Sequence, residues 1–196
     1  MTDPVAMPAA PAAPEPVAVW HAEHRNFARL LDLVERELAV FHSGERPDYE
    51  LLLDVVTYLR HFPDLAHHPR EDVAFARLVD RDPALAPLVT RLHQEHRVIA
   101  AAGERLRELL EGVLADGSFV GRAELEAACA TFLVYYRQHI QTEERDILPR
   151  AARLLDDGDW KAVADAHAGA PDPLFGGAVA DRYRELRRKI AVEAGP

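Results

Sequence analysis

The sequence predicts an all-α protein: an up-down-up-down four-helix bundle followed by a C-terminal helical extension. Large apolar residues recur at spacings of three and four residues through four long segments, which is the pattern of amphipathic helices. No segment shows the alternation of apolar and polar residues that half-buried strands require. With 196 residues, 48% of them hydrophobic and 29% charged, the chain can bury one core.

Glycines and prolines mark where the expected helices end or bend. The boundaries along the chain are Gly44, Phe62-Pro63-Asp64, Asp82-Pro83, Asp116-Gly117, Gly121 and Pro149. Of these, Phe62-Pro63-Asp64 should bend or break the second helix, and Pro149 should kink the fourth or change its direction.

Three segments follow from this pattern. Residues 1–17 form an Ala/Pro-rich tail that we expect to be disordered. Residues 18–156 form the bundle, which consists of two repeated helix pairs. Residues 157–196 form the extension, with a short helix at 160–167 and a last amphipathic helix at 179–192, and should pack on the bundle.

Composition excludes several classes of function. The 23 Lys and Arg against 33 Asp and Glu give a net charge of −10 without any basic run, so neither nucleic acid nor an anionic membrane surface is expected as a partner. No apolar stretch is long enough to span a membrane, and prolines interrupt the start of the chain where a secretory signal would lie. We therefore expect a cytoplasmic protein. Cys129 is the only cysteine, which excludes an intrachain disulfide.

An internal repeat carries the residues best suited to bind metal. The block His21-Ala22-Glu23-His24-Arg25 returns 72 residues later as His93-Gln94-Glu95-His96-Arg97. The block from His67 to Asp72 returns at His139 to Glu144, again after 72 residues. The sequence between the blocks has diverged, which suggests that these residues act together.

The repeated blocks predict a shared metal centre. His67 and Glu71, like His139 and Glu143, lie four residues apart on a helix and so point in nearly the same direction. Each pair can offer one imidazole nitrogen and one carboxylate to the interior of the bundle.

One histidine on the first helix of each half, His24 and His96, can face these pairs across the interior. Two carboxylates could then bridge two divalent ions, each with two imidazoles. Such a set of donors suits iron, manganese or zinc and is wrong for calcium or magnesium.

Several neighbours compete with these assignments. His68 could replace His67, although the repeat favours His67 because position 140 is isoleucine. Glu144 could replace Glu143, although the four-residue spacing in the first half favours Glu143.

His21 and His93 could be extra ligands or could hydrogen-bond to ligands. Tyr135, one turn before His139, could donate a hydrogen bond to a species bound at the metal, or could be a packed core aromatic.

These residues resemble the hemerythrin-like, or HHE cation-binding, domain family over nearly everything after the tail. The resemblance is carried by Glu23-His24, Tyr58, Phe62-Pro63-Asp64, His67-His68-Pro69-Arg70-Glu71-Asp72, Glu95-His96, Tyr136-Arg137-Gln138-His139, Glu143-Glu144, Leu148-Pro149 and Asp172-Pro173-Leu174-Phe175-Gly176. It implies a non-haem di-iron centre with two iron ions, for which manganese or zinc could substitute. The ligands that it implies are His24, His67, Glu71, His96, His139 and Glu143.

Oxygen-carrying hemerythrins have a further histidine one turn before the one that matches His96, and here that position is Leu92. The resemblance with this change favours a protein that binds or reduces a small oxidant, namely dioxygen, peroxide or nitric oxide, over an oxygen carrier. Such a protein could be a peroxide- or nitric-oxide-consuming oxidoreductase. The alternative is a non-enzymatic iron or oxygen sensor that signals through the stability of the bundle.

Overall fold

The computed structural model describes residues 15–115, 120–166 and 171–193. All regular elements in these ranges are helical, which confirms the all-α class. In chain order they are α1 (Glu15–His42), α2 (Tyr49–Phe62), η1 (Pro63–His67), α3 (His68–Arg81), η2 (Pro83–Leu85), α4 (Ala86–Leu114), α5 (Arg122–Thr142), η3 (Glu143–Ile147), α6 (Leu148–Leu154), α7 (Asp157–Asp165), η4 (Asp181–Tyr183) and α8 (Arg184–Glu193).

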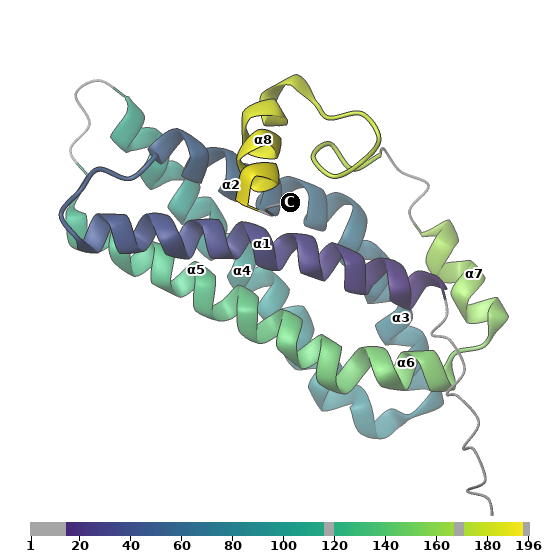
Figure 1. Ribbon diagram of the computed structural model, residues 1–196. Helices are drawn as coiled ribbons and strands as arrows, with labels where there is room; N and C mark the ends of the chain where they lie inside the picture. Colours follow the sequence, from purple (N-terminus) through teal and green to yellow (C-terminus); the bar gives the residue numbers. More distant parts are fainter. Residues whose placement is uncertain (1–14, 116–119, 167–170, 194–196) are drawn as a thin grey trace, which may run out of the picture.

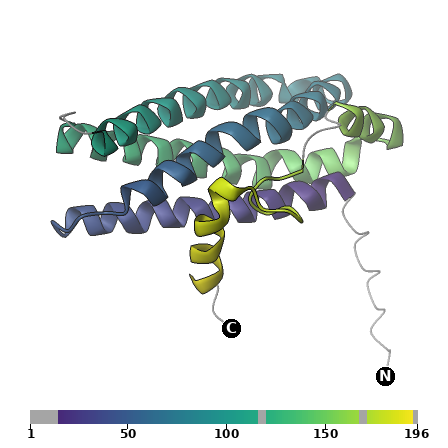
Figure 2. The same cartoon turned by 90° about the horizontal axis from the view of Figure 1, so that it is seen from above.

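Four long rods make the bundle: α1, then α2 with η1 and α3, then α4, and then α5 with η3 and α6. Consecutive rods run in opposite directions (Figures 1 and 2). The first and third rods each pack against both the second and the fourth.

Local hydrogen bonds and backbone geometry set where helices begin and end. The Asp48 carboxylate accepts a hydrogen bond from the Leu51 amide and caps α2. Gly44, with a φ of 85°, ends the turn that follows α1.

At the first expected break, Phe62-Pro63-Asp64, the rod continues through the π-helical turn η1; at the second, the π-helical turn η3 ends two residues before Pro149 and the rod continues as α6. In η1 the His68 amide donates to the Pro63 carbonyl, and in η3 the Leu148 amide donates to the Glu143 carbonyl. The π turn ends at the histidine of the first repeated pair, whereas in the second half it begins at the carboxylate. The two halves of the repeat therefore differ in their backbone at the predicted metal centre.

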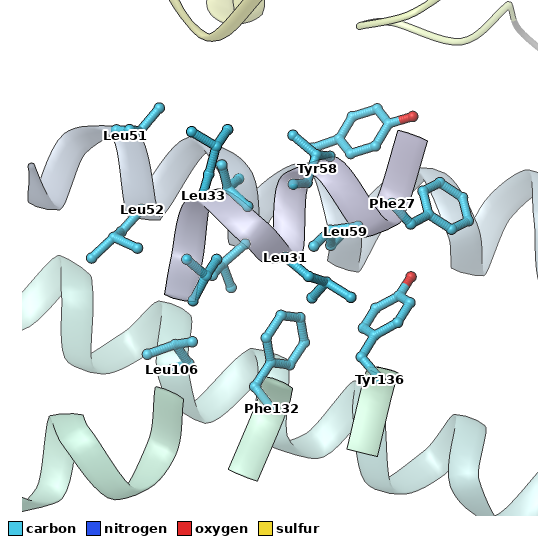
Figure 3. Packing of buried hydrophobic residues seen from close by; sticks show 14 of the residues in the cluster. Phe27, Leu31, Leu33, Leu51, Leu52, Tyr58, Leu59, Leu106, Phe132 and Tyr136 are labelled. Carbon is cyan, nitrogen blue, oxygen red and sulfur yellow. The ribbon is translucent and has the colours of Figure 1, made fainter. Parts of the chain in front are cut away.

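Two apolar clusters lie along the bundle. The larger, part of which is shown in Figure 3, includes one residue from each rod among its members: Phe27, Leu59, Leu106 and Phe132. The smaller includes Trp20, Phe75, Leu92 and Ile147. On every rod the repeated histidines and carboxylates fall in the sequence between the residues of the two clusters. They form a polar layer inside an otherwise apolar core.

The two ends of the chain extend the bundle. The first rod begins at Glu15, three residues before the expected start of the bundle, and Val17 is buried in the smaller cluster. The expectation that residues 1–17 are disordered is therefore wrong for residues 15–17, which the burial of Val17 holds in the helix, and residues 1–14 lie outside the described residues. Helix α7 packs on α3, and α8 packs on α2. The expected last helix at 179–192 is the turn η4 followed by α8. None of the described helices is long and apolar enough to cross a membrane.

Candidate metal centre

The polar layer gathers histidines and carboxylates from all four rods. Its members are His24 of α1, His67 at the end of η1, His68 and Glu71 of α3, His96 of α4, His139 of α5 and Glu143 of η3. Glu71 and Glu143 are fully buried, and the side chain of His96, the most exposed of the seven, is 11% accessible. Burial of so many ionisable groups is costly unless they neutralise one another or bind a cation.

Four residues from the first, second and fourth rods converge to form one group. His24, His67, Glu71 and Glu143 present ligand atoms that all lie within 4.8 Å of one another. The Nε2 atoms of His24 and His67 are 3.0 Å apart, and His67 Nε2 is 3.0 Å from Glu71 Oε1. We call this group the first metal position.

A second group converges beside it. His68, Glu71, His96 and His139 also present ligand atoms within 4.8 Å of one another. Glu143 borders this group, because its Oε1 lies 3.0 Å from His139 Nε2 and 3.9 Å from His96 Nε2. We call this group, with Glu143, the second metal position.

Both carboxylates turn one oxygen toward each position. Glu71 Oε1 lies beside His67, whereas its Oε2 is 3.8 Å from His96 Nε2. Glu143 Oε2 is 3.4 Å from His24 Nε2, whereas its Oε1 lies beside His139. This is the arrangement that two bridging carboxylates require.

Apart from the Nε2 atoms of His24 and His67, which hydrogen-bond to each other, the converging atoms are not satisfied by one another. Both oxygens of Glu71, both oxygens of Glu143 and the Nε2 atoms of His96 and His139 are buried without a hydrogen-bond partner among the described residues. The short separations between these nitrogens and oxygens therefore lack hydrogen-bond alignment. Lone pairs that face a common space without bonding to one another fit a cation, and a mixed imidazole and carboxylate set fits iron, manganese or zinc.

A ring of outer carboxylates binds the Nδ1 atoms of four of the five imidazoles and lies beside that of His96. His67 Nδ1 donates to Glu23 Oε2 over 2.7 Å, and His139 Nδ1 donates to Glu95 Oε2 over 3.2 Å. Arg70 holds Glu23 in turn through two contacts of 2.7 Å. Such bonds fix which ring nitrogen carries the proton, so that Nε2 is free to bind a cation.

The remaining repeated residues complete this ring. Glu144 accepts hydrogen bonds from the Nδ1 atoms of both His24, at 2.8 Å, and His21, at 2.5 Å. In the other half Asp72, which matches Glu144 in the repeat, lies 3.2 Å from His93 Nε2 and 3.6 Å from His96 Nδ1. Each half thus places a carboxylate beside histidines of the other half, and the carboxylate of Glu144 accepts a hydrogen bond from His24.

The carboxylates of the centre favour the protonated form of three of its imidazoles. Burial favours the neutral imidazole of His24, but Glu144 and Glu71 outweigh it and raise the pKa to about 9. Burial is likewise outweighed at His67, where Glu71 and Glu23 raise the pKa to about 9, and at His139, where Glu143 raises it to about 10. Burial would raise the pKa of Glu71, but the facing imidazoles hold it well below its ordinary value.

His68 behaves differently. Burial lowers its pKa to about 4 despite the hydrogen bond to Asp64, so this imidazole is neutral at physiological pH. The two histidines that competed for one ligand position, His67 and His68, both lie at the centre, each in a different group. Glu143 lies between the two positions, and Glu144 belongs to the outer ring.

The structure places Tyr135 differently from both alternatives that the sequence left open. Tyr135 is 43% exposed, so it does not face the centre. Its neighbour Tyr136 is buried, with a hydroxyl that has no hydrogen-bond partner among the described residues, and it rises from α5 toward Phe27 (Figure 3). Adjacent residues on a helix point about 100° apart. Tyr136 therefore faces the interior, whereas Tyr135, one residue earlier, is exposed.

Comparisons with known proteins give one match. The family model for the hemerythrin HHE cation binding domain matches residues 15–151, which include every member of the polar layer and of the outer ring. Neither the curated proteins nor the solved structures gave a match.

Proposed function

The chain belongs to the hemerythrin HHE cation-binding domain family, and from this premise we propose that it holds two iron ions in the polar layer and uses them to bind or reduce a small oxidant. Dioxygen, peroxide and nitric oxide are the candidate oxidants. The observation that carries the proposal is that Glu71 and Glu143 each turn one oxygen toward each metal position. A site for a single ion would not need two carboxylates shared in this way.

Iron is favoured over the other metals by the chemistry proposed. Manganese and zinc suit the same nitrogen and oxygen donors, but zinc has no redox chemistry. Two adjacent iron ions would supply the electrons for reduction of a small oxidant. The protein would bind the ions through Nε2 atoms and bridging oxygens, orient the imidazoles through the outer carboxylates, and exclude bulk water by the two apolar clusters.

A sensor is the second candidate, and one chain of contacts favours it. The Tyr58 hydroxyl donates to Asp172 of the C-terminal segment over 2.9 Å. The ring of Tyr58 is 6.5 Å from that of Phe27, which in turn lies 5.0 Å from the His67 ring. Metal occupancy could therefore alter how firmly the C-terminal segment is held, because metal binding adds its free energy to folding.

Turnover separates the two candidates. With a chemical reductant supplied in excess, anaerobic iron-loaded protein should consume peroxide or nitric oxide in molar excess over the chain and faster than the reductant alone, and the Glu71→Ala variant should not. Limited proteolysis of the C-terminal segment in the reduced and oxidised states serves as the parallel readout. Oxidant-dependent protection from proteolysis without turnover would favour the sensor, and the absence of both responses would contradict both candidates.

A further inference from the structure

We infer that His68 is the third imidazole of the second metal position, so that the two positions have unequal sets of donors. The inference rests on the proposed two-ion centre. The first position has the imidazoles of His24 and His67, and the second has those of His68, His96 and His139. Both share the two bridging carboxylates.

The contacts of His68 are those of a ligand held in place. Its side chain is 7% exposed, and its ring stacks on that of His96 with 4.0 Å between centroids. The His139 ring stands perpendicular to it at 6.1 Å. Its Nδ1 donates to Asp64 Oδ1 over 3.0 Å, and Asp64 is paired with Arg60. With Nδ1 bonded to a carboxylate, Nε2 carries the lone pair that a cation needs.

His68 has no matching histidine in the second half of the internal repeat. The equivalent position in the second half is Ile140, so the repeat alone predicts two imidazoles for each ion. Leu92, where the resemblance would place a further histidine, is fully buried in the smaller apolar cluster. The fifth imidazole therefore comes from α3, on the second rod, and not from α4.

Unequal donors decide where a small molecule can bind. The first position has two nitrogens and one oxygen from each shared carboxylate, whereas the second has three nitrogens and the other oxygen of each carboxylate. The position with fewer protein ligands keeps room for an exogenous ligand. We therefore expect the oxidant at the His24 and His67 side, whereas the absence of a histidine at Leu92 taken alone would point to the His96 side.

Anaerobic Fe²⁺ titration of the full chain tests the assignment. Wild type should bind two Fe²⁺. The His68→Ala and His68→Gln variants should bind one of the two at least about tenfold more weakly, because even loss of a residue that only supports a ligand costs that much. His61→Ala, an exposed histidine at the end of α2, is the control and should match wild type. His68→Gln keeps a side chain of similar size if the alanine variant fails to fold.

Two results separate failure of this inference from failure of the proposed function. Fewer than two Fe²⁺ in wild type would contradict the proposed centre itself. Two tightly bound Fe²⁺ in both His68 variants would overturn the ligand role of His68 while leaving the centre intact. Azide gives an independent check: oxidised wild type should saturate at one azide per centre, and either two or none would overturn the unequal donor sets.

Discussion

Glu23 should control how firmly the first metal position holds its ion. It accepts a hydrogen bond from His67 Nδ1 at 2.7 Å and is itself held by Arg70, and both of these charged side chains are less than one-fifth exposed. Replacing such a partner typically costs a factor of about 10–100 in metal affinity, or about 1.4–2.8 kcal/mol. Because this bond is short and shielded from solvent, we expect Glu23→Gln to fall near the upper end of that range.

The repeat provides a matched comparison. Glu95 plays the same part for His139, but over 3.2 Å, and its partner Arg91 is half-exposed. Glu95→Gln should therefore fall near the lower end, about tenfold. Exposed Glu45, in the loop before α2, supplies the control substitution.

The assay is the rate at which loaded protein releases metal to a chelator. Release is a better readout than uptake, because uptake also depends on the protons that the metal-free imidazoles carry. Glu23→Gln should release metal fastest, Glu95→Gln next, and Glu45→Gln at the wild-type rate. A wild-type rate for Glu23→Gln would refute the role of the outer carboxylates, and the reverse order would refute the ranking by distance and exposure.

Three further predictions concern metal content and stability. Glu71→Ala should remove a bridging carboxylate, so that metal analysis finds one or both ions lost. It should also lower the melting temperature more than the control Glu45→Ala does. Unchanged metal content would show that Glu71 does not bridge. Without metal, the stability that His24 and His139 contribute should be complete at pH 6.5 and should be lost as the pH rises through about 9 to 10, because folding raises the pKa of His24 and His139 to those values. Urea unfolding from pH 6.5 upward measures this loss, and a flat profile would contradict the assignment. Tyr136→Phe should keep the metal and raise the unfolding free energy by about 1 kcal/mol, since an unbonded buried hydroxyl is removed; a comparable loss would mean that the hydroxyl has a partner.

The repeat explains how much of this site can be predicted from the sequence. Spacing of four residues and recurrence after 72 residues identify His67 with Glu71 and His139 with Glu143 as groups that face the interior. The same repeat contains Glu23 and its match in the second half, but periodicity cannot say which histidine each outer carboxylate reaches. That depends on how the rods pack, which places Glu23 of the first rod against the second rod.

The π turns explain why the sequence could not predict which side chains near them face the interior. A π turn adds one residue to a helical turn and changes which side chains face inward, while the apolar pattern on both sides stays helical. Pro63 and Pro149 signal a disturbance, but not its kind or its exact register. The position of η1 directly before His68 accounts for a second buried imidazole that the repeat did not predict.

Metal stoichiometry combined with an optical spectrum tests the central claim most directly. Protein grown in iron-replete medium, purified and then reduced without oxygen should contain about two iron ions per chain, because two carboxylates face both metal positions. Exposure to air should then change its visible and near-ultraviolet absorption as the iron is oxidised. A reproducible absence of bound transition metal, or iron whose spectrum does not respond to air, would contradict a di-iron centre that reacts with oxidants.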